Sequence, residues 1–140
     1  MTLPVTPQLL RDAAAAGVHR LAPADTQTVL DAAAAAGLCS MRIDLAGCCS
    51  KPDLLARIAD ALEFPWWFGQ NWDALADCLG DLEWLPAEGY VLLLDAADDL
   101  RRAAPRDYAT VTEVFADAAR SWREHGTPFW VFISSAEETT

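Results

Sequence analysis

No lysine, arginine or histidine occurs between Ile58 and Leu100, a window that carries ten aspartates and glutamates. Over all 140 residues, 21 acidic side chains outnumber 10 Lys and Arg, so the formal net charge is −11 and the isoelectric point about 4.3. This charge disfavours nucleic acid or an anionic membrane as a direct ligand, because their phosphates are repelled. We therefore expect no direct nucleic-acid or membrane partner, whereas a basic protein is a compatible one.

Metal-binding and export signals are also scarce. The four cysteines show no C-x-x-C spacing and the chain has only two histidines, so we expect reduced, structural thiols and neither a metal nor a cofactor. Residues 1–21 have neither a basic start nor a continuous apolar core, and no apolar run approaches the length of a membrane span. These absences predict a cytoplasmic protein without a signal peptide.

Catalytic motifs are absent as well, because the chain has no P-loop, G-x-G-x-x-G, H-E-x-x-H or G-x-S-x-G sequence. Two carboxylate sites stay conceivable: a hydrolase that uses Asp73 and Asp77 as acid and base, and a divalent-cation site that adds Asp81. Acids on a convex helix face are solvated, and one helix row offers ligands from a single direction. We therefore predict that the protein is not an enzyme and binds no metal.

Aromatic side chains are abundant in the segment Phe64–Trp84, FPWWFGQNWDALADCLGDLEW, which holds four of the six tryptophans. Pro65 favours a turn, and Gly69 is suited to a positive φ angle. Asn71 is a good N-cap for a helix from Trp72 to about Leu82. Apolar residues recur within this helix at helical spacing and predict a buried stripe: Leu75, Cys78, Leu79 and Leu82.

Asp73, Asp77 and Asp81 lie one helical turn apart on a different face of the same helix. The helix dipole favours Asp73 in the first turn, but like charges at i and i+4 cost about 0.2–0.5 kcal/mol per pair. The alternative is an ordinary exposed acidic face, although such a face usually includes lysines. The adjoining aromatics favour an interface, because aromatic residues dominate binding hot spots and charged arrays steer partners. We therefore predict a binding surface for a strongly basic partner.

Strands and helices alternate along the chain, which predicts an α/β fold with a parallel sheet and right-handed crossovers. We expect strands at 18–21, 41–45, 90–94 and 129–133. We expect helices at 6–16, 26–36, about 50–62, 72–82, 98–104 and from 108 to near 126. Residues 1–37 are assigned to an N-terminal helical or edge extension and residues 38–140 to the main domain, with one compact domain overall as the simplest arrangement.

The run Phe-Pro-Trp-Trp-Phe-Gly-Gln-Asn-Trp-Asp-Ala-Leu-Ala-Asp-Cys-Leu resembles the signature of the barstar family, small inhibitors of bacterial ribonucleases. The similarity extends from Met41 to Ser134. Members of this family have a small three-stranded parallel sheet packed with helices, to which residues 18–21 would add a fourth strand at an edge. The resemblance implies that the acidic helix and the aromatic turn plug the basic active site of a nuclease.

Individual roles are also implied by the resemblance. Asp77 and Asp73 match the main anionic contacts, with Asp77 the deepest, and Asp117 matches the acid of a second contact helix. Flanking contacts are expected from further residues of the turn and helix: Trp67, Gly69, Asn71, Trp72, Ala76 and Asp81. The best-known family member differs at four positions, with leucine for Trp72, tryptophan for Ala76, glycine for Asp81 and an acid for Ser121. Under the alternative interpretation of the aromatics, Trp66, Phe68 and Trp72 cap the core.

These observations lead to one expected function and one alternative. We expect a ribonuclease inhibitor that acts as an immunity protein or antitoxin against a basic secreted or toxin ribonuclease. A monomer is favoured, although the sequence does not set the oligomeric state. The alternative is an acidic protein-interaction module whose basic partner is not a nuclease.

Overall fold

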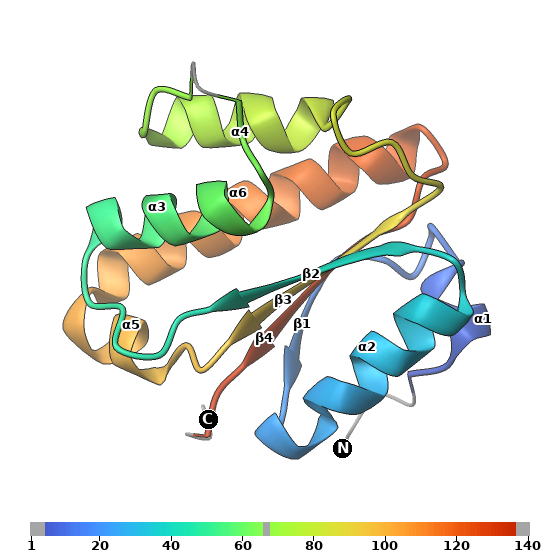
Figure 1. The fold of residues 1–140 in the computed structure, drawn as a ribbon, viewed down its shortest axis with the longest axis horizontal. Helices are drawn as coiled ribbons and strands as arrows, with labels where there is room; N and C mark the ends of the chain where they lie inside the picture. The colour runs from blue at the N-terminus through green and yellow to red at the C-terminus, as the bar shows by residue number, and fades with distance from the viewer. Residues whose placement is uncertain (1–4, 66–67, 137–140) are drawn as a thin grey trace.

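The computed structural model describes residues 5–65 and 68–136. Its centre is a four-stranded parallel sheet with the order β1-β4-β3-β2 (Figure 1). The strands are β1 (Val18–Leu21), β2 (Cys39–Asp44), β3 (Tyr90–Asp95) and β4 (Phe129–Ser134). The helices are α1 (Pro7–Leu10), α2 (Thr26–Ala35), α3 (Lys51–Ala61), α4 (Trp72–Asp81), α5 (Asp98–Ala103) and α6 (Pro105–Glu124), with a short 3-10 helix η1 (Pro23–Asp25). The predicted α/β class and the fourth strand at an edge are confirmed.

The two central strands, β3 and β4, are buried on both faces. Five of the six residues of β3 and all six of β4 are buried, which explains why their sequences, YVLLLD and FWVFIS, are continuous apolar runs. Parallel strands covered on both faces lose the alternation of polar and apolar residues. The edge strands β1 and β2 keep exposed polar residues, as edge positions usually do.

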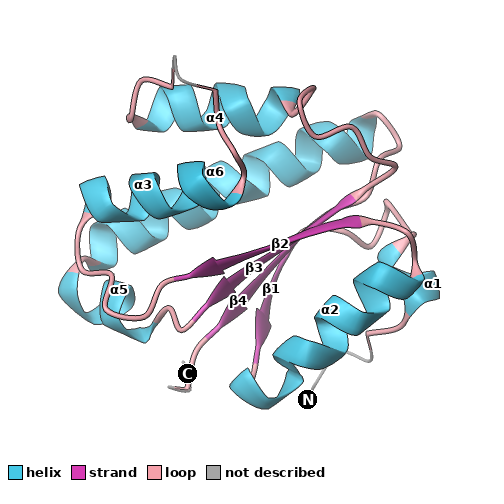
Figure 2. Cartoon of the chain, viewed as in Figure 1, coloured by secondary structure: helices cyan, strands magenta, loops and turns pink. Residues whose placement is uncertain are grey.

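Helices cover the sheet from both sides and make three layers (Figure 2). On one side, α3, α4, α5 and α6 pack over a core that includes Leu92, Val131 and Phe115. On the other side, α1 and α2 pack over a second core that includes Leu93, Trp130 and Val29. Residues 5–37 therefore supply the edge strand β1 and the whole second helical layer.

The first helix is much shorter than predicted. Thr6 is the expected N-cap, since its hydroxyl oxygen accepts the Leu9 N–H at 3.1 Å, but α1 ends at Leu10 and not at Ala16. Beyond it, the Asp12 carboxylate accepts the Ala14 N–H at 3.0 Å, a local bond that competes with the helix. The Leu10 carbonyl accepts the Trp130 indole N–H at 2.8 Å, so a tertiary contact anchors this end.

Other boundaries moved by a few residues. The strand expected from Met41 begins at Cys39, because the β2–β3 register pairs Cys39 with Tyr90. The last long helix begins at Pro105, the first-turn position that suits proline, and not at Tyr108. No helix in residues 5–65 and 68–136 is long and apolar enough to cross a membrane.

Candidate functional site

The turn before α4 determines where that helix begins. Asn71 Oδ1 accepts the Ala74 backbone N–H at 2.8 Å, and Asn71 Nδ2 donates to the Gly69 carbonyl at 3.2 Å, so the predicted N-cap is confirmed. The positive φ angle expected at Gly69 was wrong, because it falls on Gln70 at 52°. Gly69 instead leaves room for the cap, since a Cβ there would lie 3.2 Å from Asn71 Nδ2.

Helix α4 separates its apolar and acidic faces as the periodicity predicts. The inner face is buried on the side of α4 that packs against α6, and consists of Leu75, Cys78 and Leu79. Leu82, also buried, ends the helix in the left-handed conformation with φ of 50°. The outer face is exposed and carries four of the residues predicted as contacts: Asp73, Ala76, Asp77 and Asp81. The structure therefore brings these four together on one convex surface, which we call the acidic face.

The three carboxylates of the acidic face form no ion pair with the described residues. Within the described part of the chain, no Lys, Arg or His lies within 4.0 Å of Asp73, Asp77 or Asp81. Other acids are neutralised by arginines: Asp95 by Arg42, and Asp99 by Arg102 at 2.9 Å. The negative charge of the acidic face is therefore available to a partner.

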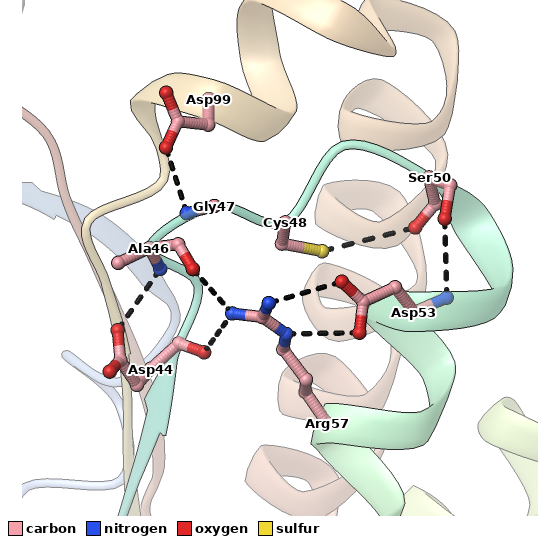
Figure 3. Close-up of polar contacts among 8 residues, drawn as sticks. All are labelled: Asp44, Ala46, Gly47, Cys48, Ser50, Asp53, Arg57 and Asp99. Carbon is pink, nitrogen blue, oxygen red and sulfur yellow. Dashed lines mark hydrogen bonds and ion pairs between the residues drawn. The ribbon is translucent and has the colours of Figure 1, made fainter.

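A network centred on Arg57 contains an acid, Asp53, that is paired within the protein, in contrast to the acids of the acidic face (Figure 3). Both carboxylate oxygens of Asp53 accept from Arg57, at 3.1 Å each, and this interaction raises the pKa of the Arg57 guanidinium. Arg57 also donates to the carbonyls of Asp44 and Ala46 at 3.0 and 2.7 Å, and so fixes the loop after β2. The i,i+4 spacing of Asp53 and Arg57 was visible in the sequence, but the loop carbonyls were not.

The aromatic residues near α4 are divided between core and surface. Phe68 packs edge-on against Phe64 with ring centroids 4.9 Å apart and contacts the main core, in agreement with its interpretation as a core residue. Trp84 fixes the same cluster, because its indole N–H donates to the Leu62 carbonyl at 2.9 Å. Trp66 and Trp67, for which core and contact roles were predicted, lie outside the described residues.

Trp72 lies at the boundary between the core and the acidic face. It is partly buried against the main core, and the Lys51 ammonium lies 5.0 Å from its ring centroid, a cation–π distance. Sequence reasoning missed this pair, because Lys51 and Trp72 belong to different helices and no local spacing connects them. Lys51 therefore places one positive charge beside Trp72, the residue that precedes Asp73.

Helix α6 lies beside α4 and holds the predicted second contact (Figure 1). The Trp122 indole N–H donates to the Leu79 carbonyl at 2.8 Å and ties the two helices together. Asp117 is exposed, but its carboxylate pairs with Arg120 at 3.1 Å, unlike the acids of α4. A partner that uses Asp117 must therefore compete with Arg120.

The electrostatic effect of the acidic face reaches the buried side of α4. Burial raises the pKa of the Cys78 thiol, and the charges of Asp77 and Asp81 raise it further. The thiol therefore stays protonated at neutral pH and acts as a small apolar side chain. The described ranges contain no group of three or more His, Cys, Asp or Glu side chains placed to hold a metal ion.

Comparison with known proteins gives one family and one distant structural likeness. The family model described as "Barstar (barnase inhibitor)" matches residues 38–134, more than half of the chain. A comparison with curated proteins found no match. Among solved structures, a Walker-type ATPase of Pyrococcus abyssi is similar at 13% identity and a TM-score of 0.48, over 86% of this chain and 40% of that chain. The chain thus spans well under two thirds of that ATPase, and the likeness is too weak to carry an argument.

The family match covers β2, β3, β4 and all four helices on the α4 side of the sheet, and leaves residues 1–37 outside. It includes the turn, the acidic face and Asp117. Members of this family are inhibitors and not enzymes. On the strength of this match, the chain belongs to the barstar family.

Proposed function

We propose that this protein inhibits a basic ribonuclease by inserting the acidic face of α4 into the active-site cleft of the enzyme. The observation that carries the proposal is the row of Asp73, Asp77 and Asp81, which is exposed and has no Lys, Arg or His of the described residues within 4.0 Å, in a member of a family of ribonuclease inhibitors. A ribonuclease must bind RNA phosphates, so its cleft is lined with Arg and Lys. Carboxylates at one-turn spacing, about 6 Å apart, occupy the places of successive phosphates.

The elements around the row hold it ready for binding. The Asn71 cap fixes the first turn, the buried stripe of α4 fixes its rotation, and Trp122 fixes its distance from α6. Little conformational entropy is then lost when the partner docks, which favours tight binding. Ala76, between Asp73 and Asp77, adds no bulk, so a guanidinium can approach the helix closely.

The contacts are expected to differ in strength. Asp77 lies at the middle of the row and becomes the most desolvated, Asp73 is next, and Asp117 is weaker because Arg120 already pairs with it. Truncating one member of a desolvated charge pair costs about 2–5 kcal/mol. This energy was obtained in part from the best-known complex of the same family, so it is not an independent prediction for this chain. Gly69, Asn71, Trp72 and Asp81 flank the centre, and Trp67 stays a prediction from the sequence.

The biological setting follows from the same chemistry. An inhibitor of this kind serves as an immunity protein or antitoxin, which protects a producing cell from its own secreted or toxin ribonuclease. A cytoplasmic monomer without cofactor and without catalytic activity suits that role. Hydrolysis by the purified protein that disappears in Asp73→Asn would contradict it.

The function is tested with purified protein and a panel of basic microbial ribonucleases that includes barnase, the enzyme named in the family description. Cleavage of a fluorogenic RNA substrate is measured against inhibitor concentration. Inhibition should weaken in Asp77→Asn and stay unchanged in Asp31→Asn, which removes the same charge from α2 on the opposite face of the sheet. If a basic partner captured from the native cell binds the acidic face but cleaves no RNA, the alternative interaction module is correct.

A further inference from the structure

The exposed edge of the sheet at β1 carries a groove that the acidic face does not use. Its volume is ≈ 440 Å³, and its lining comes from β1, β4 and the first half of α6: Val18, His19, Arg20, Tyr108, Ala109, Thr112 and Ile133. All seven of these residues lie outside α3 and α4, and β1 lies outside the family match. The groove is therefore a feature of this chain's N-terminal extension combined with α6.

Among the described residues, the backbone of β1 is paired with β4 alone. The Val131 N–H donates to the Gly17 carbonyl at 2.9 Å, and the Ser135 N–H donates to the Leu21 carbonyl at 3.4 Å, so these residues face β4. Because successive residues of a strand alternate in direction, Val18 and Arg20 direct their N–H and C=O groups away from the sheet. An extended segment placed beside β1 would find these groups ready for hydrogen bonding.

Charge favours an acidic occupant. Arg20 is exposed, no carboxylate of residues 5–65 or 68–136 lies within 4.0 Å of its guanidinium, and no Asp or Glu lines the groove. Arg123 adds a second positive charge near the start of β1, where it donates to the Ala16 carbonyl at 3.2 Å. The whole chain is acidic, but no arginine lies between Ile58 and Leu100. The arginines are therefore concentrated in other elements, which include β1 and α6.

A second copy of this chain is a poorer occupant. The sequence of β1 is Val-His-Arg-Leu, so a second β1 edge would add another Arg20 and supply no acid. The apolar wall formed by Val18, Ala109 and Ile133 instead fits a β-branched side chain next to the acid. We propose that this groove binds an extended peptide segment of a partner protein, which adds a strand beside β1 and pairs a carboxylate with Arg20.

The test uses defined peptides and the full-length protein. The probe is acetyl-Thr-Val-Glu-Val-Thr-amide, compared with versions that carry Gln or Lys in place of Glu. Binding is followed by two-dimensional NMR of the ¹⁵N-labelled protein at up to about 1 mM peptide, where weak complexes are detectable. The amides of Val18, Arg20 and Thr112 should shift, and the Glu peptide should bind about three- to tenfold tighter than the Lys peptide. Methylation of the backbone nitrogens of the Glu peptide should abolish the shifts.

Charge reversal supplies the decisive comparison. Arg20→Glu should invert the order, so that the Lys peptide binds better, whereas Arg106→Glu, an exposed change outside the groove lining, should leave the order unchanged. Equal binding of the three peptides, shifts confined to other elements, or an unchanged preference in folded Arg20→Glu would each overturn the proposal. Ribonuclease inhibition should be the same with and without peptide, so failure here is distinguishable from failure of the proposed function.

Discussion

Replacing Asp77 with asparagine should weaken inhibition and stabilise the folded protein at the same time. The side chain keeps its size but loses its charge, at an exposed position in the middle of the acidic row. In the free protein, this removes like-charge repulsion with Asp73 and with Asp81, about 0.2–0.5 kcal/mol for each pair. The free energy of unfolding should therefore rise by about 0.4–1 kcal/mol, or the Tm by about 1–4 °C for a chain of this size.

In the complex, the same change has the opposite sign. Loss of the charge leaves a cation of the nuclease desolvated without a partner, which costs about 2–5 kcal/mol and raises Kd by about 30-fold to several thousandfold. Most of that change should be a faster dissociation rate, because the interaction is formed only after docking. A residue retained for binding is expected to show this exchange of stability for function.

Stopped-flow association and dissociation with the inhibited ribonuclease, together with urea unfolding, measure both effects. Glu83→Gln combined with Glu88→Gln, two exposed acids outside the row, should mainly slow association at low salt, since distant charges act through screened attraction. The stabilisation of Asp77→Asn should fade in about 1 M salt, where the screening length is about 3 Å. A folded Asp77→Asn protein that inhibits as tightly as wild type would contradict the proposed binding mode. A variant that is less stable than wild type would contradict the repulsion between Asp77 and its neighbouring acids.

Removing residues 1–37 should uncover the sheet face that carries Trp130, so stability in urea should fall more than the affinity of the fraction that stays folded; a folded truncation without inhibition would contradict the proposed site. Trp122→Phe keeps an aromatic side chain, with a smaller ring, but removes the indole N–H that donates to the Leu79 carbonyl, so the free energy of unfolding should fall by about 1–2 kcal/mol. Wild-type stability in this variant would show that the bond contributes little. Burial raises the pKa of three thiols above the value of 9.0 at which they ionise in the unfolded chain, so the unfolded state loses protons first and stability should fall as pH rises above about 9. Urea titrations between about pH 8 and about pH 10 check this prediction, and a free energy of unfolding that does not change with pH would contradict it. The thiols concerned are those of Cys39, Cys48 and Cys78.

Helix α4 was predictable from the sequence because its determinants are local. Asn71 as the cap and the spacing of Leu75, Cys78 and Leu79 lie within one short window, and they also determine which way the acids point. The central strands were predictable for a similar reason, since their continuous apolar runs need no knowledge of their neighbours.

Features that depend on contacts between distant segments were not predictable. The alanine run at 13–16 has high helix propensity, but the Asp12 side chain and the bond from Trp130 to Leu10 override it. The ion pair of Asp117 and Arg120 could have been predicted from its i,i+3 spacing. The placement of Lys51 over Trp72 could not, because the two residues lie on different helices. Pairs between distant segments, such as Asp95 with Arg42, therefore had to come from the structure.

The position of the last strand in the middle of the sheet has a consequence for synthesis. β4 lies between β1 and β3, and its neighbourhood is joined to the N-terminal layer by bonds such as Trp130 to Leu10 and Val131 to Gly17. At translation rates of about 5–20 residues per second, β1 has no partner strand for roughly 5–20 s after it is made. During that time the apolar face of α2 has no completed sheet to cover, and we expect a nascent chain stalled before Phe129 to be bound by chaperones. The four-stranded sheet is therefore complete only when β4 has left the ribosome.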